Sequence, residues 1–298
     1  MDMKHRLPVV YGGRRRLAWA SFQEVSRNAK LSPCELRTGR DGLERTYSTG
    51  SKISSTHVSV SATCPDYCVF KDHGCFAQSG TDTHTVEHDP AVDEVDGLNV
   101  IREEARLIRE AFGDPIRAKG GKRGQGPRDL RLHVSGDVTC AEGAKLLAAA
   151  ADDWVRRRGG SVWTYTHRWE EIPREAWGSN ISVFASVEDP EDIERAAALG
   201  YPSALTVRRF KHGATPFRVE ATARRVIPCP EETYRHRVAS GLDRGRHPKP
   251  TCVTCRLCLD RDILGKINAV IAFEVHGQDR DAERARRRLP DFPHAPWA

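Results

Sequence analysis

From residue 56 onward, segments with a strand pattern alternate with segments with a helical pattern, and this alternation constrains the fold most. Strands are expected at 56–63, 130–139, 161–167, 181–189, 202–210 and 217–228, and a strand or short buried helix at 267–277. Helices are expected at 99–112, 141–158, 169–177 and 190–199. Such spacing is typical of βαβ units with right-handed crossovers and a parallel sheet.

The expected fold is therefore α/β, a full or partial (βα) barrel of the TIM type. A doubly wound open sheet is the competing arrangement, but no glycine fingerprint for a dinucleotide follows a strand. Residues 1–50 read as an irregular N-terminal extension and 51–240 as the barrel core. Residues 241–298 read as a Cys-rich metal-binding segment that also carries the last barrel element and a charged tail.

The hydropathy of the chain argues against a membrane protein. No apolar run reaches the ~18 residues that a membrane span needs, and the first residues lack the apolar core of a signal peptide. We therefore expect a soluble, cytoplasmic protein with no membrane partner. The sequence gives no expectation for its oligomeric state.

The chain is moderately basic, with a formal net charge of +6. Arginine triplets stand at 14–16, 156–158 and 286–288, and a Gly-rich basic loop spans 119–128. Such charge favours polyanionic partners, nucleic acid above all, because basic side chains neutralise phosphates. A solvated basic surface is the alternative explanation.

Nine cysteines are unusual for a chain expected in a reducing compartment, where clustered thiols bind metal or carry out chemistry more often than they form disulfides. The first group, C-x3-C-x6-C, consists of Cys64, Cys68 and Cys75 in a loop after the first expected strand. It has no evident fourth ligand. Three thiolates would leave one iron of a [4Fe–4S] cluster, or one zinc position, open to an external ligand.

The second group, C-x2-C-x2-C, consists of Cys252, Cys255 and Cys258. Thiolates at this spacing can bind one metal from a single turn, and a fourth ligand completes a tetrahedron. With His276 the group would form a zinc site, and with Cys229 an all-thiolate zinc site or an iron–sulfur cluster. The pattern leaves both possibilities open.

Polar side chains follow several expected strands, as they do at the functional edge of barrel enzymes. Ser135, Gly136 and Asp137 end the second strand, Tyr165 and His167 end the third, and Asp189 ends the fourth. Asp137, Tyr165, His167 and Asp189 are the candidate catalytic residues. Asp137 and Asp189 also suit helix capping, and His167 suits an ordinary loop position.

The strand, the Cys64 loop with its Cys75-Phe76-Ala77 end, and the helix that follows resemble the start of a radical S-adenosylmethionine (SAM) barrel. Ser135-Gly136-Asp137 resembles the Gly-Gly-Glu segment of that superfamily, which contacts the SAM amino group. The resemblance implies a [4Fe–4S] cluster on Cys64, Cys68 and Cys75, with SAM at the open iron. It also implies that Tyr165 and His167 line the substrate pocket and that the later cysteines bind a second cluster or zinc. The last gap of the first group is six residues, where the superfamily usually has two.

Two further families share features with the chain. Lys52-Ile53-Ser54, the stretch 62–65 and the stretch 74–77 resemble a Cys-rich family of phage- and plasmid-encoded proteins, which implies a mobile-element context. The second Cys group is similar to the zinc site of tRNA- and DNA-guanine transglycosylases, which need two aspartates, here Asp137 and Asp189. We therefore expect a metal-dependent enzyme that modifies a nucleic acid or nucleotide. A transglycosylase-like zinc enzyme and a zinc-stabilised nucleic-acid-binding protein are the alternatives.

Overall fold

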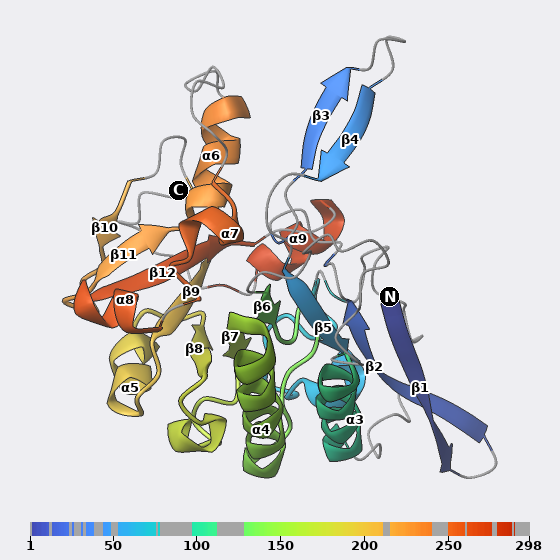
Figure 1. Cartoon of the computed structure of the whole chain (residues 1–298). Coiled ribbons are helices and arrows are strands. Elements are labelled where there is room, and N and C mark those ends of the chain that lie inside the picture. Colours follow the sequence, from blue (N-terminus) through green and yellow to red (C-terminus); the bar gives the residue numbers. More distant parts are fainter. Residues whose placement is uncertain are drawn as a thin grey trace.

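A computed structural model shows a mixed α/β protein in which helices pack against a broad sheet (Figure 1). The structure describes residues 2–11, 14–23, 26, 31, 34–38, 44–48, 53–75, 77, 97–111, 128–210, 215–239, 250–259, 261–275, 279–287 and 289. The strands are β1 (Asp2–Tyr11), β2 (Arg14–Gln23), β3 (Cys34–Thr38), β4 (Glu44–Ser48), β5 (Ser54–Val58), β6 (Arg128–Arg131), β7 (Gly159–Thr166), β8 (Ile181–Val187), β9 (Ser203–Val207), β10 (Phe217–Arg218), β11 (Arg225–Pro228) and β12 (Ala269–Glu274).

Ten of these strands form one sheet in the order β1-β2-β5-β6-β7-β8-β9-β12-β11-β10. All neighbours from β5 to β11 run parallel, whereas β1, β2 and β10 join antiparallel at the two edges. The mostly parallel α/β sheet is as expected. A closed TIM barrel is not formed by the described residues, because a hairpin at one edge and β10 at the other occupy the positions where closure would occur.

The strands β5 to β9 follow each other in the sheet as they do in the sequence. Right-handed crossovers between successive neighbours place every connecting helix on the same face. A doubly wound sheet would instead reverse direction and cover both faces with such helices. The opposite, inner face of β5 to β9 is thus available for a site.

The helices are α1 (Val60–Thr63), α3 (Gly97–Glu110), α4 (Ala141–Arg158), η2 (Arg174–Trp177, a 3-10 turn), α5 (Asp192–Ala198), α6 (Pro230–Ala239), α7 (Cys252–Cys255), α8 (Arg261–Lys266) and α9 (Asp279–Arg286). The helices expected around 99–112, 141–158 and 190–199 are confirmed as α3, α4 and α5. The helix expected at 169–177 is present only as the short turn η2. The strand expected at 56–63 ends at Val58, and α1 follows it.

The main core lies between the outer face of the sheet and the helices α3, α4 and α5. Alternate strand residues point into it, among them Leu130, Val162, Val183 and Leu205, all fully buried. Trp154 on α4 packs there, and its indole donates to the Arg128 carbonyl oxygen at 2.6 Å. This packing fixes the order of the strands on whose inner face the site is built.

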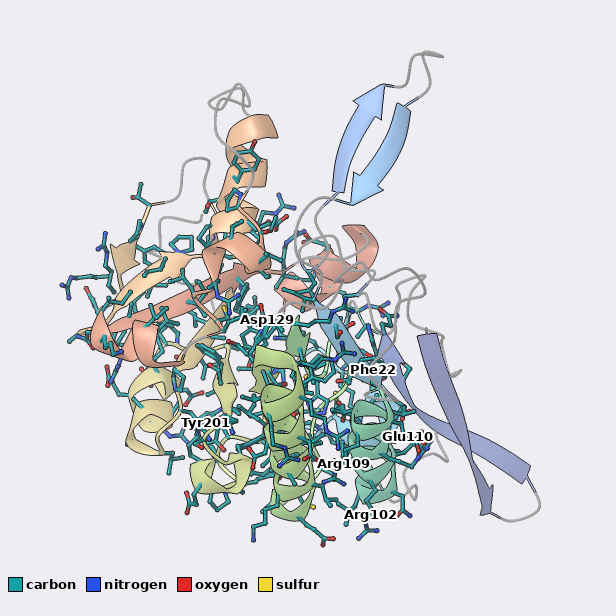
Figure 2. All side chains as sticks on the ribbon, viewed as in Figure 1. Phe22, Arg102, Arg109, Glu110, Asp129 and Tyr201 are labelled. Atoms are coloured by element: carbon teal, nitrogen blue, oxygen red, sulfur yellow. The ribbon has the colours of Figure 1, made fainter. Side chains whose placement is uncertain are left out.

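The N-terminal region departs from the irregular extension that was expected. β1 and β2 form a hairpin, and β2 pairs antiparallel with β5 from Ala20↔Val58 to Gln23↔Ser55. Phe22 on β2 is buried in the main core, 5.9 Å from the Trp154 ring, and is labelled beside α3 in Figure 2. The weak apolar periodicity of this region hid a strand that only long-range pairing stabilises.

Candidate active site

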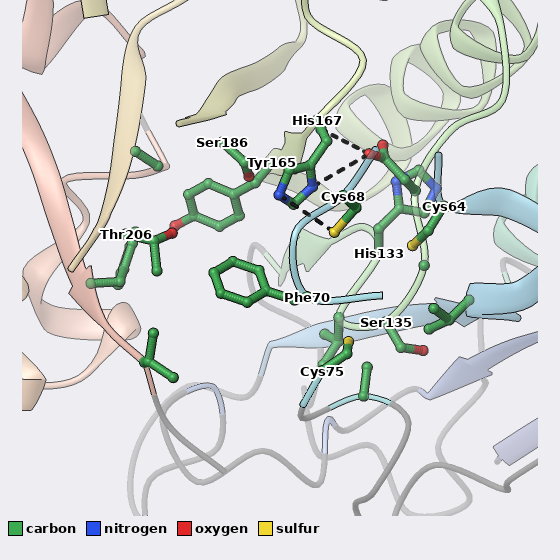
Figure 3. A pocket seen from close by; sticks show the side chains of 18 of the residues that line it. Cys64, Cys68, Phe70, Cys75, His133, Ser135, Tyr165, His167, Ser186 and Thr206 are labelled. Atoms are coloured by element: carbon green, nitrogen blue, oxygen red, sulfur yellow. Dashed lines mark hydrogen bonds and ion pairs between the residues drawn. The ribbon is translucent and has the colours of Figure 1, made fainter. Parts of the chain in front are cut away.

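A pocket of about 270 Å³ opens on the inner face of the sheet, at and below the carboxyl ends of the parallel strands (Figure 3). The first Cys loop lines one side of it with Cys64, Cys68 and Cys75. Cys252 of the second Cys group lines it as well. The structure therefore brings both cysteine groups, nearly two hundred positions apart in the sequence, to one cavity. Ser135, Asp137, Tyr165 and His167, all expected from the sequence, line it too.

The first Cys loop is held in a compact turn directly after α1, the short helix that follows β5. The Cys64 amide donates to the Val60 carbonyl oxygen at 2.9 Å, and the Cys75 amide donates to that of Phe70 at 3.0 Å. The Lys71 ammonium ties the loop together by donating to the Cys64 carbonyl oxygen at 3.1 Å and to the Asp66 carboxylate at 2.6 Å. The six residues before Cys75 thus form an ordered turn that returns the third thiol toward the first two.

The segment Ser135-Gly136-Asp137 lies against the start of this loop. The Val58 amide donates to the Ser135 carbonyl oxygen at 3.0 Å, and the Asp137 amide donates to the Thr63 hydroxyl at 3.1 Å. Gly136 has φ +81, and a Cβ there would lie 2.3 Å from Val58 Cγ2 and 2.7 Å from its carbonyl oxygen. Only glycine allows this close approach.

His167 connects the Cys loop to two carboxylates. Its Nε2 lies 3.8 Å from Cys68 Sγ and 3.0 Å from Glu188 Oε1. The Asp137 carboxylate accepts the His167 backbone amide at 2.8 Å and lies 3.9 Å from Nδ1. Figure 3 shows the His167 imidazole beside the Cys68 thiol. The arrangement fixes the ring and offers acid–base chemistry at the pocket wall.

The pKa values of Cys64 and Cys68, two thiols of the first group, are shifted in opposite directions. Burial raises the pKa of Cys64 well above its usual value, and the negative charges of Asp137, Cys68 and Cys75 add to this. Burial also raises the pKa of Cys68, but the hydrogen bond and the charge of His167 outweigh it, so the net pKa is lowered. For His167, burial lowers the pKa, while Glu188 and Cys68 raise it well above 6.5 overall. Repulsion among the thiolates therefore opposes the deprotonation of Cys64, and a bound cation or cluster would relieve it.

The second Cys group forms part of the pocket floor, toward the amino ends of β6 and β7. Arg256 has φ +57 and donates to the Asp129 carboxylate at 2.7 Å and to the Ser161 hydroxyl at 3.1 Å. Arg256 therefore anchors the turn to the sheet by pairing with a carboxylate. Cys258 shares a hydrogen bond with Tyr165, and burial raises its pKa to about 12.

The sequence offered Cys229 and His276 as the fourth ligand of this group, and the structure describes only Cys229. Cys229 follows β11, and its amide donates to the Ala272 carbonyl oxygen at 2.8 Å, near the carboxyl end of β12. Cys258 shares a hydrogen bond with Tyr165, and the thiol charges that raise its pKa are those of Cys252 and Cys255. His276 lies outside the described residues. Among the described residues, no group of three or more His, Cys, Asp or Glu side chains is arranged to hold a single metal ion.

Asp189, expected as a catalytic residue, is exposed and is absent from the residues that line the pocket. Its carboxylate accepts the Glu191 amide at 3.0 Å. Its side chain therefore forms a local turn ahead of α5, whose N-cap is Glu191, instead of facing the pocket. The two aspartates of a transglycosylase-type site are not brought together in this pocket.

Three polar side chains at or beside the pocket were not among the candidate catalytic residues. Glu188, next to Asp189, contacts His167, as described above. His133 and Arg131 also line the pocket. His133 Nε2 lies 2.8 Å from Glu104 Oε2, and the Thr56 hydroxyl donates to the other oxygen at 2.5 Å. The residue pattern of 130–134 predicted a strand. It gave no indication that the alternation breaks at His133, where φ is +49.

Fold and site together define an open, mostly parallel α/β protein with a cysteine-lined pocket at its strand ends. The chain belongs to the GP88 (Gene product 88) family, whose model matches residues 23–261. Searches of curated proteins and of solved structures returned no significant match. Within the described part of the chain, no helix is long and apolar enough to cross a membrane.

Proposed function

We propose that the protein is a metal-dependent enzyme of the iron–sulfur/SAM type that covalently modifies a nucleic acid or a nucleotide in a phage or mobile-element context. One observation carries the proposal. A three-cysteine loop follows the first parallel strand and lies directly against the Ser-Gly-Asp segment that follows the adjacent strand. This is the arrangement that a partial (βα) barrel of the radical-SAM type would need.

The donor set of the pocket fits a cluster better than a single ion. Cys64, Cys68 and Cys75 are within electrostatic range of one another, yet no three ligands among the described residues converge as a single ion requires. A [4Fe–4S] cluster takes each thiolate on a different iron, so its ligands stand further apart. With three thiolates, one iron keeps an open position for SAM. When bound, the cluster would supply an electron for one-electron chemistry on SAM.

The residues of the chain would then have separate roles. Ser135 and Asp137 would hold the SAM amino group beside the Cys loop. Tyr165 and His167 would line the substrate side, where His167, fixed by Glu188 and Asp137, would hold or move a proton. Cys252, Cys255 and Cys258 would bind a second cluster or zinc under the floor of the pocket.

The iron content of the protein tests this proposal. Protein purified without oxygen and reconstituted with iron and sulfide is expected to be brown. Its first Cys group should hold about four iron and four sulfide ions. The triple variant Cys64→Ala, Cys68→Ala, Cys75→Ala should lose this complement. The matched control is Cys140→Ala, which removes a half-buried thiol at the start of α4 that is absent from the pocket lining.

Other outcomes favour the alternatives. Colourless protein with one tightly held zinc and no iron would exclude the cluster and favour a transglycosylase-like enzyme, although the exposed position of Asp189 already weakens that reading. Zinc at both groups with tight DNA binding and no turnover would favour a zinc-stabilised binding protein. A triple variant that keeps its iron would refute the ligand assignment.

A second candidate function rests on the contact between Cys68 and His167. A thiol near an imidazole that a carboxylate orients is the arrangement of a cysteine nucleophile with its base. The Sγ–Nε2 distance of 3.8 Å is long for a hydrogen bond to sulfur, as is common before substrate binds. In this alternative, a thiol-reactive substrate analogue would form an adduct on Cys68 detectable by mass spectrometry, in protein that binds no iron.

A further inference from the structure

Arg131, at the end of β6, places a charged side chain in the pocket. Its guanidinium carbon lies 4.0 Å from the centre of the Tyr165 ring. Burial lowers the pKa of Arg131, and the groups that raise it are Tyr165, Cys258 and Cys252. In the described part of the chain, no carboxylate forms a hydrogen bond or ion pair with it.

The acidic side chains that line the pocket are already engaged. Among the described residues they are Asp137 and Glu274. The Asp137 carboxylate accepts the His167 and Val138 amides at 2.8 and 2.7 Å. The Glu274 carboxylate accepts the Phe210 amide at 3.2 Å and lies 4.0 Å from Arg286. An enclosed guanidinium with no acid nearby is costly unless a ligand compensates its charge.

We propose that Arg131, stacked on Tyr165, is the binding subsite for an oxyanion group, a phosphate or a carboxylate, of a small substrate. A guanidinium presents a planar fork of N–H donors that matches the oxygens of either group. Stacking on the ring holds the plane of the fork in place. This names the substrate class of the proposed enzyme and in that sense rests on the proposed function.

The size and depth of the pocket define what such a substrate can be. At about 270 Å³ the cavity lies just below the ~300–1,000 Å³ of typical small-molecule sites, so it fits one small molecule or one nucleotide unit. Arg131 pairs with Trp163 in the sheet, below Tyr165, whereas His167 lies two residues beyond Tyr165, ~7 Å further along an extended chain. An anion held by Arg131 leaves the other end of the molecule near His167 and the Cys loop.

Thermal unfolding of the purified protein with added anions tests the subsite. Inorganic phosphate or acetate should raise Tm saturably at constant ionic strength, and which of the two acts distinguishes a phosphate from a carboxylate source. Where phosphate acts, at least one ribonucleoside monophosphate should bind at least ~10-fold tighter than its nucleoside, the equivalent of one charged hydrogen-bond pair. The Arg131→Gln variant should lose these effects, and Arg131→Lys should keep only part of them.

The control variant is Arg158→Gln. It removes an arginine that also stacks on an aromatic ring, Trp154 at 5.7 Å, but on α4 and away from the pocket. It should keep the anion effects in full. No response of the wild-type protein to either anion, or an equal response in Arg131→Gln, would overturn the proposal and leave Arg131 as a counter-charge for the floor thiolates. Because the readout needs no turnover, this outcome is independent of the iron measurements above.

Discussion

Cys68 Sγ lies 3.8 Å from His167 Nε2, although 99 positions separate the two residues in the sequence. The contact joins the first Cys loop to the carboxyl end of β7. His167 in turn contacts Glu188 beyond β8, so three strand ends share one polar network. This network is where the pH dependence of the pocket originates.

In metal-free protein, Cys68 should react with iodoacetamide at a lower pH than Cys64. The pKa of Cys68 is lowered by His167 despite its burial, whereas that of Cys64 is raised well above its usual value. Only the thiolate reacts, so the Cys68 profile should reach its midpoint first. Mass spectrometry of alkylated peptides across pH 5 to 10 measures both profiles.

The conservative variant His167→Asn should move the Cys68 midpoint to higher pH and leave that of Cys140 unchanged. Equal midpoints for Cys64 and Cys68 in the wild-type protein would contradict the electrostatic description of the loop.

The buried pair Glu104–His133 should stabilise the fold, because it links α3 to the end of β6 with both side chains fully buried. Glu104→Gln should lower the free energy of unfolding by about 3 kcal/mol near pH 6, since it leaves a buried imidazole without its counter-charge. Denaturant unfolding of the two proteins measures the difference.

The same pair predicts a pH dependence. Burial lowers the pKa of His133, but the charge and hydrogen bond of Glu104 outweigh this and raise it overall. A raised folded-state pKa means that the contribution is fully present below about pH 6.5, the unfolded value, and is lost as the pH rises through the folded value. The difference in the free energy of unfolding between wild type and Glu104→Gln should therefore decrease above pH 6.5. A gap that widens with pH would contradict the pair.

Gly136→Ala should destabilise the protein more than Gly159→Ala. Both glycines have positive φ, +81 and +67, so both substitutions carry backbone strain of order 1 kcal/mol. Only at Gly136 would the new Cβ also meet Val58 and Thr63, within 2.3 to 2.8 Å, while at Gly159 it meets nothing within 4 Å. The difference in denaturation midpoint isolates the close approach of the Ser-Gly-Asp segment to the Cys loop. Equal losses would show that this approach is relaxed in solution.

Cys229→Ser should leave the metal content of the second Cys group unchanged. Cys229 pairs with the carboxyl half of β12, and the thiol charges that raise the pKa of Cys258 are those of Cys252 and Cys255. Cys258→Ser, in contrast, should lose one metal site, as measured by elemental analysis of the reconstituted protein. Loss of the same metal from the Cys229→Ser variant would show that Cys229 is a ligand of the second Cys group.

Several elements could be predicted because their signals are local. The apolar stripe of α3, the length of α4 and the alternating strands β7 and β8 depend on neighbouring residues alone. The strand β2 could not, since its stability comes from pairing with β5 and from burying Phe22 against Trp154. Of the full or partial barrel that was expected, the described residues do not form the full one for a similar reason, because edge pairing leaves no trace in periodicity.

Which side chains follow which strands could be read from the sequence alone, and this identified the candidates Cys64, Asp137, Tyr165 and His167. Three features came only from the tertiary structure: both cysteine groups meet at one pocket, Asp189 turns away from it, and Arg131 lines it with no acidic partner among the described residues. The physical reason is that spacing along a chain specifies the face and end of a strand. The partners across the cavity depend on how strands pair and on how loops return over the sheet.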